Sequence, residues 1–130
     1  MQNGKQKTMT VKSKPFDLGD RLLEFAVAVI KATYLFPKSQ VASHIAQQLV
    51  RSTTSAGANY EEARSGQSKA DFVHKMQLTL KELRESSYWI KLASRLDFQL
   101  SSDWDDVAQE SRELLLIFAK SVATTKGVAR

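Results

Sequence analysis

Residues 53–96 read TTSAGANYEEARSGQSKADFVHKMQLTLKELRESSYWIKLASRL, with a strong helical pattern on both sides of Gly66. Glycine adopts the left-handed conformation that closes a helix more readily than other residues, so Gly66 is the predicted helix end. Ser68, followed three places on by Asp71, is typical of a capped helix start. The sequence therefore predicts two long helices joined by a short turn.

Two helices joined by so few residues pack antiparallel, because a short connection returns the chain along its neighbour. Folding this hairpin about Gly66 is expected to bring Arg51 near Glu82 and Asn59 near His74.

The chain of 130 residues has the size of one domain and contains no cysteine, which excludes disulfides, thiolate metal sites and thiol nucleophiles. Its N-terminus lacks an apolar run of signal-peptide length, and the longest apolar run is too short to cross a bilayer. We expect a soluble cytoplasmic protein that does not enter a membrane.

The net charge of +5 comes from the two ends of the chain. Six of the 19 basic residues lie in residues 1–14 and 126–130, which leaves 13 basic against 14 acidic residues between them, a net charge of −1. We predict a disordered basic tail over residues 1–14, a helical domain over residues 15–125 and a flexible C-terminus over residues 126–130. Such tails bind phosphate weakly and with strong salt dependence, although a solubilising role explains them equally well.

Apolar residues spaced three and four apart predict a further helix on each side of the central hairpin. The first helix follows Asp17 and ends at Pro37, and Ser39 is expected to cap the second. Ser102 with Asp105 is expected to cap the fourth. Four helices with short connections predict an all-α, antiparallel up-down-up-down four-helix bundle.

The expected inward positions are, in the first helix, Leu18, Leu22, Phe25, Val29, Thr33 and Phe36; in the second (about 40–64), Val41, Ile45, Leu49, Ser52, Ala56, Asn59 or Tyr60, and Ala63; in the third (68–96), Phe72, Met76, Leu80, Leu83, Ser87 and Ile90; and in the fourth, Trp104, Val107 or Ala108, Ser111, Leu114 or Leu115, Phe118 and Val122.

Residues 52–58, STTSAGA, are uniformly small. Gly57 inside a helix costs roughly 1 kcal/mol relative to alanine unless a close approach compensates it. We expect a large aromatic or methionine side chain of the third helix to pack against this stretch.

Two segments are apolar on nearly all helix faces, FAVAVI at residues 25–30 and LLLIFA at residues 114–119. A helix of an isolated four-helix bundle buries about one face, so the remaining apolar surface predicts an oligomer. Alternatively, the small alanines of the first segment are simply tolerated outside. The interface candidates, which include two adjacent aromatics that cannot both face one core line, are Phe25, Val27, Ile30, Tyr88, Trp89, Leu116 and Ile117.

No catalytic or metal-binding pattern is present in the sequence. Di-metal sites in bundles need Glu-x-x-His on two helices, whereas this chain has only Asp71-x-x-His74 and a lone His44. Serine, histidine and aspartate occur in no spacing typical of an activated nucleophile. We expect no enzymatic activity, no metal and no cofactor.

One polar set lies where the two central helices are expected to face each other: Arg51, Asn59, Glu62, Lys75, Glu82 and Glu85. A charge is partly buried only when it is paired, so we interpret the set as an inter-helix network that fixes the register of the hairpin. A ligand-binding role is the alternative.

The central hairpin also carries a family resemblance, on the run SAGANYEEA at Ser55–Ala63, Asp71-Phe72, Lys75, Lys81-Glu82, Glu85, Tyr88 and Trp89. On these residues, and over roughly residues 16–118, the chain resembles the four-helix bundle family of proteins encoded within intervening sequences of bacterial 23S ribosomal RNA genes. Asn59 and Glu62 align with the family's Asn-Ile-Ala-Glu-Gly signature. Different residues at its other three positions indicate a sub-branch.

The resemblance implies an all-α subunit of a ring-like homopentamer with no established enzymatic activity. The family looks similar to the accessory proteins of diversity-generating retroelements, which are pentamers that bind nucleic acid and a reverse transcriptase. RNA or DNA, and a reverse transcriptase or another protein, are therefore the partners that the resemblance implies.

Two functions are left open. The first is a nucleic-acid-associated scaffold, in which a ring repeats weak cationic contacts. Its candidate contacts are Lys5, Lys7, Lys12, Lys14, Lys31, Arg64, Lys91, Arg95 and Lys120. The second is a protein–protein interaction module that uses the leftover apolar and aromatic surface without touching nucleic acid.

Overall fold

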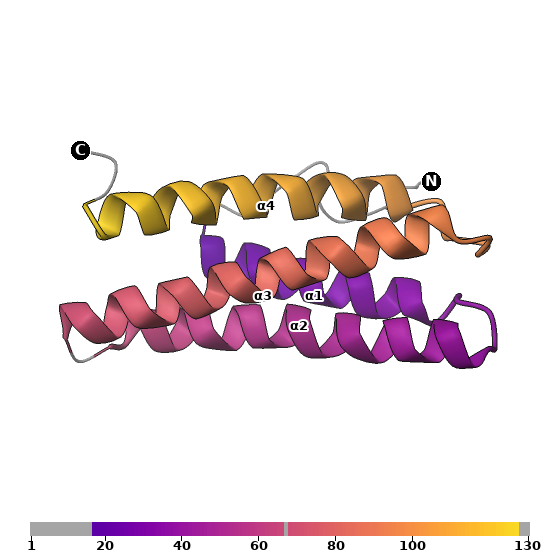
Figure 1. Cartoon of the computed structure of the whole chain (residues 1–130), viewed down its shortest axis with the longest axis horizontal. Coiled ribbons are helices and arrows are strands. Elements are labelled where there is room, and N and C mark those ends of the chain that lie inside the picture. Colours follow the sequence, from indigo (N-terminus) through magenta and orange to yellow (C-terminus); the bar gives the residue numbers. More distant parts are fainter. Residues whose placement is uncertain (1–16, 67, 128–130) are drawn as a thin grey trace, which may run out of the picture.

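The computed structural model describes residues 17–66 and 68–127, which form four helices. Helix α1 spans Leu18–Thr33, α2 Gln40–Arg64, α3 Lys69–Arg95 and α4 Trp104–Thr125. Each helix runs opposite to the one before it and packs against it, and α1 also packs against α4 (Figure 1). The prediction of an all-α fold with four helices is confirmed, and the described residues contain no strand. The predicted basic tail and residues 128–130 lie outside the described residues.

The two caps predicted for the central helices are present. The Ser39 hydroxyl accepts the backbone N–H of Ala42 at 3.1 Å, and the Ser68 hydroxyl accepts that of Asp71 at 3.1 Å. Each bond satisfies an amide of the first helical turn that has no partner within the helix. Because capping depends on residues three apart in the chain, the sequence alone located both helix starts.

The predicted role of Gly66 is wrong in its mechanism. Helix α2 does end just before Gly66, but this residue does not adopt a positive φ, and Gly127 is the only described residue that does. The turn is closed instead by the Gly66 backbone N–H, which donates to the Ala63 carbonyl at 3.1 Å.

Two other helix ends differ from the prediction. Helix α1 ends at Thr33, four residues before Pro37, and continues as a turn in which the Phe36 backbone N–H donates to the Thr33 carbonyl at 3.1 Å. Helix α4 has Asp103, not Ser102, as its N-cap residue, and no side chain caps it.

An aromatic cluster accounts for both differences. The Phe36 ring lies 5.1 Å from the Phe98 ring and 5.9 Å from the Trp104 ring. Phe36 is buried although it lies beyond the end of α1. The Trp104 Nε1–H donates to the Ser94 hydroxyl at 2.8 Å. Burying these rings together fixes where α1 ends and α4 begins, and burial depends on tertiary packing that capping patterns do not report.

The core follows the predicted apolar stripes, and its largest fully buried apolar side chains are Phe25, Phe118, Leu22, Ile45, Leu49, Leu83 and Leu114. Burying each such side chain contributes roughly 1.5–3 kcal/mol. The prediction for Val41 is wrong: this side chain is 57% exposed, whereas the adjacent Ala42 is fully buried. Positions 42, 45 and 49 are buried on the inward face of α2, whereas position 41, in the first turn, lies at the edge of that face and is exposed.

The small residues of α2 pack differently from the prediction. A methyl group placed on Gly57 would lie 3.9 Å from Leu22 of α1, so α1 approaches this position and no large group of α3 does. Towards α3 the stretch presents small polar groups instead. The Ser52 and Ser86 hydroxyls lie 2.8 Å apart, and the Thr79 hydroxyl lies 3.5 Å from the Ala56 carbonyl.

Candidate functional site

The cations predicted to contact nucleic acid are spread over all four helices. All five that the structure describes are exposed: Lys31, Arg64, Lys91, Arg95 and Lys120. Lys5, Lys7, Lys12 and Lys14 lie outside the described residues. Within residues 17–66 and 68–127, four of the five form no ion pair.

The exception is Arg64, at the end of α2. Its Nη1 atom lies 3.3 Å from the Asp17 carboxylate and 3.7 Å from the Glu61 carboxylate. Its guanidinium also lies over the Tyr60 ring, 5.6 Å from the centroid. Two carboxylates already balance this charge, which makes Arg64 the weakest of the five candidates for a phosphate contact.

Lys91 and Arg95 come together at a groove between α3 and α4, with a volume of about 180 Å³. The groove adds a third cation, Arg112 of α4, which the sequence analysis did not single out. The described residues that line it include no carboxylate, and they are Ser87, Ile90, Lys91, Ser94, Arg95, Ala108, Ser111 and Arg112. We call this surface the α3–α4 groove.

The inter-helix polar set assembles around Arg51. The Arg51 Nη1–H donates to the Glu82 carboxylate at 3.1 Å, and Nη2–H donates to the Glu85 carboxylate. Glu82 is buried and Glu85 is half-buried, so the guanidinium supplies the charge partner that a shielded carboxylate requires. Arg51 therefore ties α2 to two successive turns of α3.

Nearer the hairpin turn, the Lys75 ammonium donates to the Glu62 carboxylate at 2.5 Å. Asn59 does not join the network, and its prediction is wrong: the Asn59 side-chain N–H donates to the Ser55 carbonyl of its own helix at 2.9 Å. A short amide side chain reaches a carbonyl one turn back more easily than it reaches a neighbouring helix.

Glu85 is the carboxylate whose titration the network changes. The hydrogen bond from Arg51 lowers the pKa of Glu85, partial burial opposes this, and a 3.3 Å hydrogen bond from the Trp89 Nε1–H lowers it further. The hydrogen bond that Arg51 donates to Glu85 likewise raises the pKa of Arg51. Both shifts favour the charged pair.

A second, more deeply buried ion pair joins α1 to α4, and the sequence analysis missed it. The Arg21 Nε–H and Nη2–H donate to the two Glu110 oxygens at 2.8 and 2.9 Å, and Nη2–H also donates to Glu113 at 2.9 Å. The Glu110 side chain is only 2% exposed. The hydrogen bond to Glu110 is the main reason that the pKa of Arg21 is raised.

The sequence did contain a signal for this pair. Glu110 lies on the same α4 stripe as the buried Val107 and Leu114. A carboxylate at a core position needs a cation opposite it, because an unpaired buried charge is very costly.

Residues 17–120 match the model of the 23S rRNA-intervening sequence protein family. The chain belongs to this family. A crystal structure of a protein of unknown function from the S23 ribosomal protein family of Bacteroides thetaiotaomicron is 31% identical to it, with a TM-score of 0.72 over 82% of this chain and 98% of that chain. A comparison with curated proteins found no match.

The resemblance stated from the central hairpin is thus confirmed for both family and fold. The similar crystal structure is itself that of a protein of unknown function, so the surface of this family member is the basis for its function.

The seven predicted interface residues of this family member differ in exposure. Val27, Tyr88 and Leu116 are exposed, and Ile30, Trp89 and Ile117 are half-buried. Phe25 lies in the core. The prediction that Phe25 belongs to an interface is therefore wrong, because Phe25 lies on the inward face of α1. Trp89 lies between two aromatic neighbours, 5.5 Å from the His44 ring and 5.1 Å from the Tyr88 ring.

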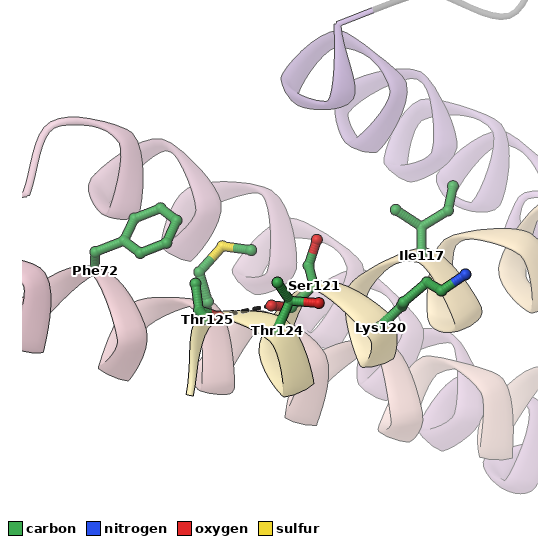
Figure 2. Close-up of a pocket in the computed structure, with 7 residues that line it drawn as sticks. Phe72, Ile117, Lys120, Ser121, Thr124 and Thr125 are labelled. Atoms are coloured by element: carbon green, nitrogen blue, oxygen red, sulfur yellow. Dashed lines mark hydrogen bonds between the residues drawn. The ribbon is translucent and has the colours of Figure 1, made fainter. Parts of the chain in front are cut away.

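A second hollow between α3 and α4 lies at the opposite end of this helix pair from the α3–α4 groove, and its volume is about 430 Å³. Phe72 and Ile117 lie on opposite sides of it (Figure 2). The Thr125 hydroxyl in its wall donates to the Ser121 carbonyl at 2.6 Å. Lys120 lines this hollow, so the structure separates Lys120 from Lys91, Arg95 and Arg112.

Residues 17–66 and 68–127 contain no group of three or more histidine and acidic side chains placed to hold a metal ion. None of the helices that these residues form combines the length and apolarity of a membrane span.

Proposed function

We propose that this family member is a non-enzymatic, oligomeric helical scaffold that acts in the cytoplasm and binds RNA or DNA as an accessory factor. The observation that carries the proposal is the grouping of Lys91, Arg95 and Arg112 around one groove whose described lining has no carboxylate. The region between the tails has a net charge of −1, so binding by overall charge is weak there. A local cluster of cations can still attract a phosphate backbone.

Assembly would multiply this weak contact. Each copy brings one groove, and a ring of copies presents several at fixed spacing, so the second contact forms at a high effective concentration. Exposed apolar side chains on α1 and α4 support assembly: Val27 is 37% exposed, Leu23 59% and Leu116 70%. We propose a ring-like homopentamer as the form that binds nucleic acid.

A binding assay across a salt series tests the nucleic-acid function. Fluorescence anisotropy with labelled single-stranded RNA, duplex RNA and duplex DNA is expected to show binding at low salt. The logarithm of the association constant should fall linearly with the logarithm of the salt concentration. A flat anisotropy signal for all three probes at low salt would end the proposal.

A second function, a protein interaction module, is favoured by a different observation. Tyr34 and Leu35, just after α1, and Val41, near the start of α2, are all more than half exposed. Exposed aromatic and aliphatic side chains are typical of a protein interface. A reverse transcriptase is the partner that we propose for this surface. Co-expression with it should give a stable complex that the double variant Y34E/L35E loses, while K38E serves as the charge-matched control.

A further inference from the structure

Ser111 has an unusual position in the core. In residues 17–66 and 68–127, its hydroxyl is the only buried side-chain oxygen or nitrogen without a hydrogen-bond partner, and the residue is 2% exposed. Two other helical serines donate one turn back, Ser86 to the Glu82 carbonyl and Ser94 to the Ile90 carbonyl. Burying a hydroxyl without a hydrogen-bond partner destabilises the fold by roughly 1–3 kcal/mol. A ligand that accepts a hydrogen bond from Ser111 would explain why a serine occupies this position.

Ser111 is one of the residues that line the α3–α4 groove, together with the cations Lys91, Arg95 and Arg112. Lys91 and Arg95 follow Ser87 at spacings of four and eight, so they lie on one face of α3. Arg112 follows Ser111 on α4 and uses one N–H on Gln109, at 2.7 Å. A guanidinium has five N–H donors, so Arg112 retains donors for a ligand.

We propose that the α3–α4 groove binds one phosphate group, held by the Ser111 hydroxyl and by Lys91, Arg95 and Arg112. The lining described above offers positive charge and N–H and O–H donors, which suits a ligand that is anionic and carries several acceptor oxygens. Ala108 keeps the α4 side open, and about 180 Å³ corresponds to about six water molecules, which leaves room for a phosphate group.

The source of the phosphate follows from the proposed function, on which this step rests: a phosphodiester of a nucleic-acid backbone. The groove is short and its cations come from two helices, so it holds one phosphate and reads no base. Contacts of this kind position a nucleic acid without selecting its sequence.

Inorganic phosphate tests the site without nucleic acid. In ¹H–¹⁵N NMR spectra of the full chain, phosphate is expected to shift the amides of residues 87–95 and 108–112 more than those around Lys31 and Lys120. The S111A variant should bind phosphate roughly tenfold more weakly, because a hydrogen bond to a charged group is lost. S111A should unfold at the same urea concentration as the wild type or a higher one, since it removes an unpartnered hydroxyl.

Nucleic acid tests the source. The double variant K91Q/R95Q is expected to bind RNA or DNA roughly tenfold more weakly at low salt and to reduce the salt slope by about 1–2. The control K31Q/K120Q removes the same charge elsewhere and should have a smaller effect.

The outcomes separate the two proposals. Suppose that the wild type binds nucleic acid, that K91Q/R95Q and K31Q/K120Q lose the same affinity, and that phosphate shifts no amide signal of the groove. The phosphate site is then refuted, while the proposed nucleic-acid function is not. If phosphate moves the groove amides but no nucleic acid binds, the site stands for free phosphate and the proposed function fails. Equal shifts at all surface lysines would refute the site.

Discussion

The carboxylate of Glu85 shows how one contact makes stability depend on pH. Hydrogen bonds from Arg51 of α2 and Trp89 of α3 reach it, and the Arg51 bond lowers its pKa. An unfolded glutamate titrates near about 4.3, so the folded pKa lies below that value. The pair therefore stabilises the fold above that pH, and this contribution is lost as the pH falls through the folded pKa.

We expect E85Q to unfold at a lower urea concentration than the wild type at pH 7 and to converge with it below about pH 4. The Glu85 side chain is 31% exposed, so the difference at pH 7 should be modest, about 1 kcal/mol or less. Urea titrations followed by circular dichroism at several pH values measure it, with the exposed Glu24→Gln as control. A gap that stays constant down to pH 3 would mean that Glu85 acts through packing and not through charge.

The buried pair of Arg21 and Glu110 predicts a larger effect. R21M removes the two hydrogen bonds that Arg21 donates to a carboxylate that is 2% exposed, so we expect a loss of about 3 kcal/mol in the free energy of unfolding. The double variant R21M/E110M should recover most of this loss, because well-packed apolar groups replace a buried ion pair with little net change. Urea denaturation of the two single variants and the double variant gives the coupling energy. A double variant as unstable as the sum of the singles would contradict the prediction.

The sequence predicted polar contacts between helices that are joined by a short turn, because the turn determines which residues face each other. Arg51 and Glu82 were expected together because a short turn determines which residues of α2 and α3 face each other. Arg21 and Glu110 are 89 residues apart in the chain, and Arg21 has Asp20 and Glu24 beside it as local alternatives. Their pairing depends on how α1 docks on α4, which no local pattern reports.

Helix α2 was predicted over the same residues as it has in the structure, but the packing of its small stretch was not. Periodicity and a cap locate a helix because both depend on near neighbours in the chain. The neighbour of Gly57 depends on the rotation of α2 in the bundle. In the structure it is Leu22 of α1, at a distance that leaves room for a methyl group.

We therefore expect G57A to stabilise the protein. Alanine restores helix propensity and reduces the freedom of the unfolded chain, and its methyl group would make an ordinary 3.9 Å contact with Leu22. The expected gain in the free energy of unfolding is about 0.5–1 kcal/mol, measured by urea denaturation. G57V is the comparison, because a β-branched side chain needs more room beside Leu22 and is expected to lose this gain. Destabilisation by alanine itself would show that α1 lies closer to Gly57 than the structure has it.

Self-association is predicted from surface that one copy leaves uncovered. Of the two all-round apolar segments, Phe25 and Phe118 are buried within the copy, whereas Val27 and Leu116 are exposed. From the sequence we predicted that these segments carry more apolar side chains than an isolated copy can bury. The sequence could not show which of these residues lie in the core and which are left for an interface. That assignment follows from the rotation of α1 and α4, which packing sets.

Size-exclusion chromatography with light scattering is expected to give a mass that is a multiple of 14.6 kDa. L116E should shift the population towards the single copy, because a carboxylate in an apolar contact pays a desolvation penalty. Q47E adds a charge at an exposed position of α2 and serves as control. A wild-type mass of 14.6 kDa at every concentration would remove both the ring and its avidity.

The hydroxyl pair at the centre of the hairpin, Ser52 and Ser86, has a consequence for how the family can diverge. Ser86 donates its proton to the Glu82 carbonyl, so the 2.8 Å bond between the two hydroxyls uses the proton of Ser52. Losing Ser52 leaves Ser86 satisfied, whereas losing Ser86 first deprives Ser52 of its acceptor. Mutational paths that keep every ancestor folded should therefore change position 52 before position 86, and living relatives should more often have kept the second serine than the first.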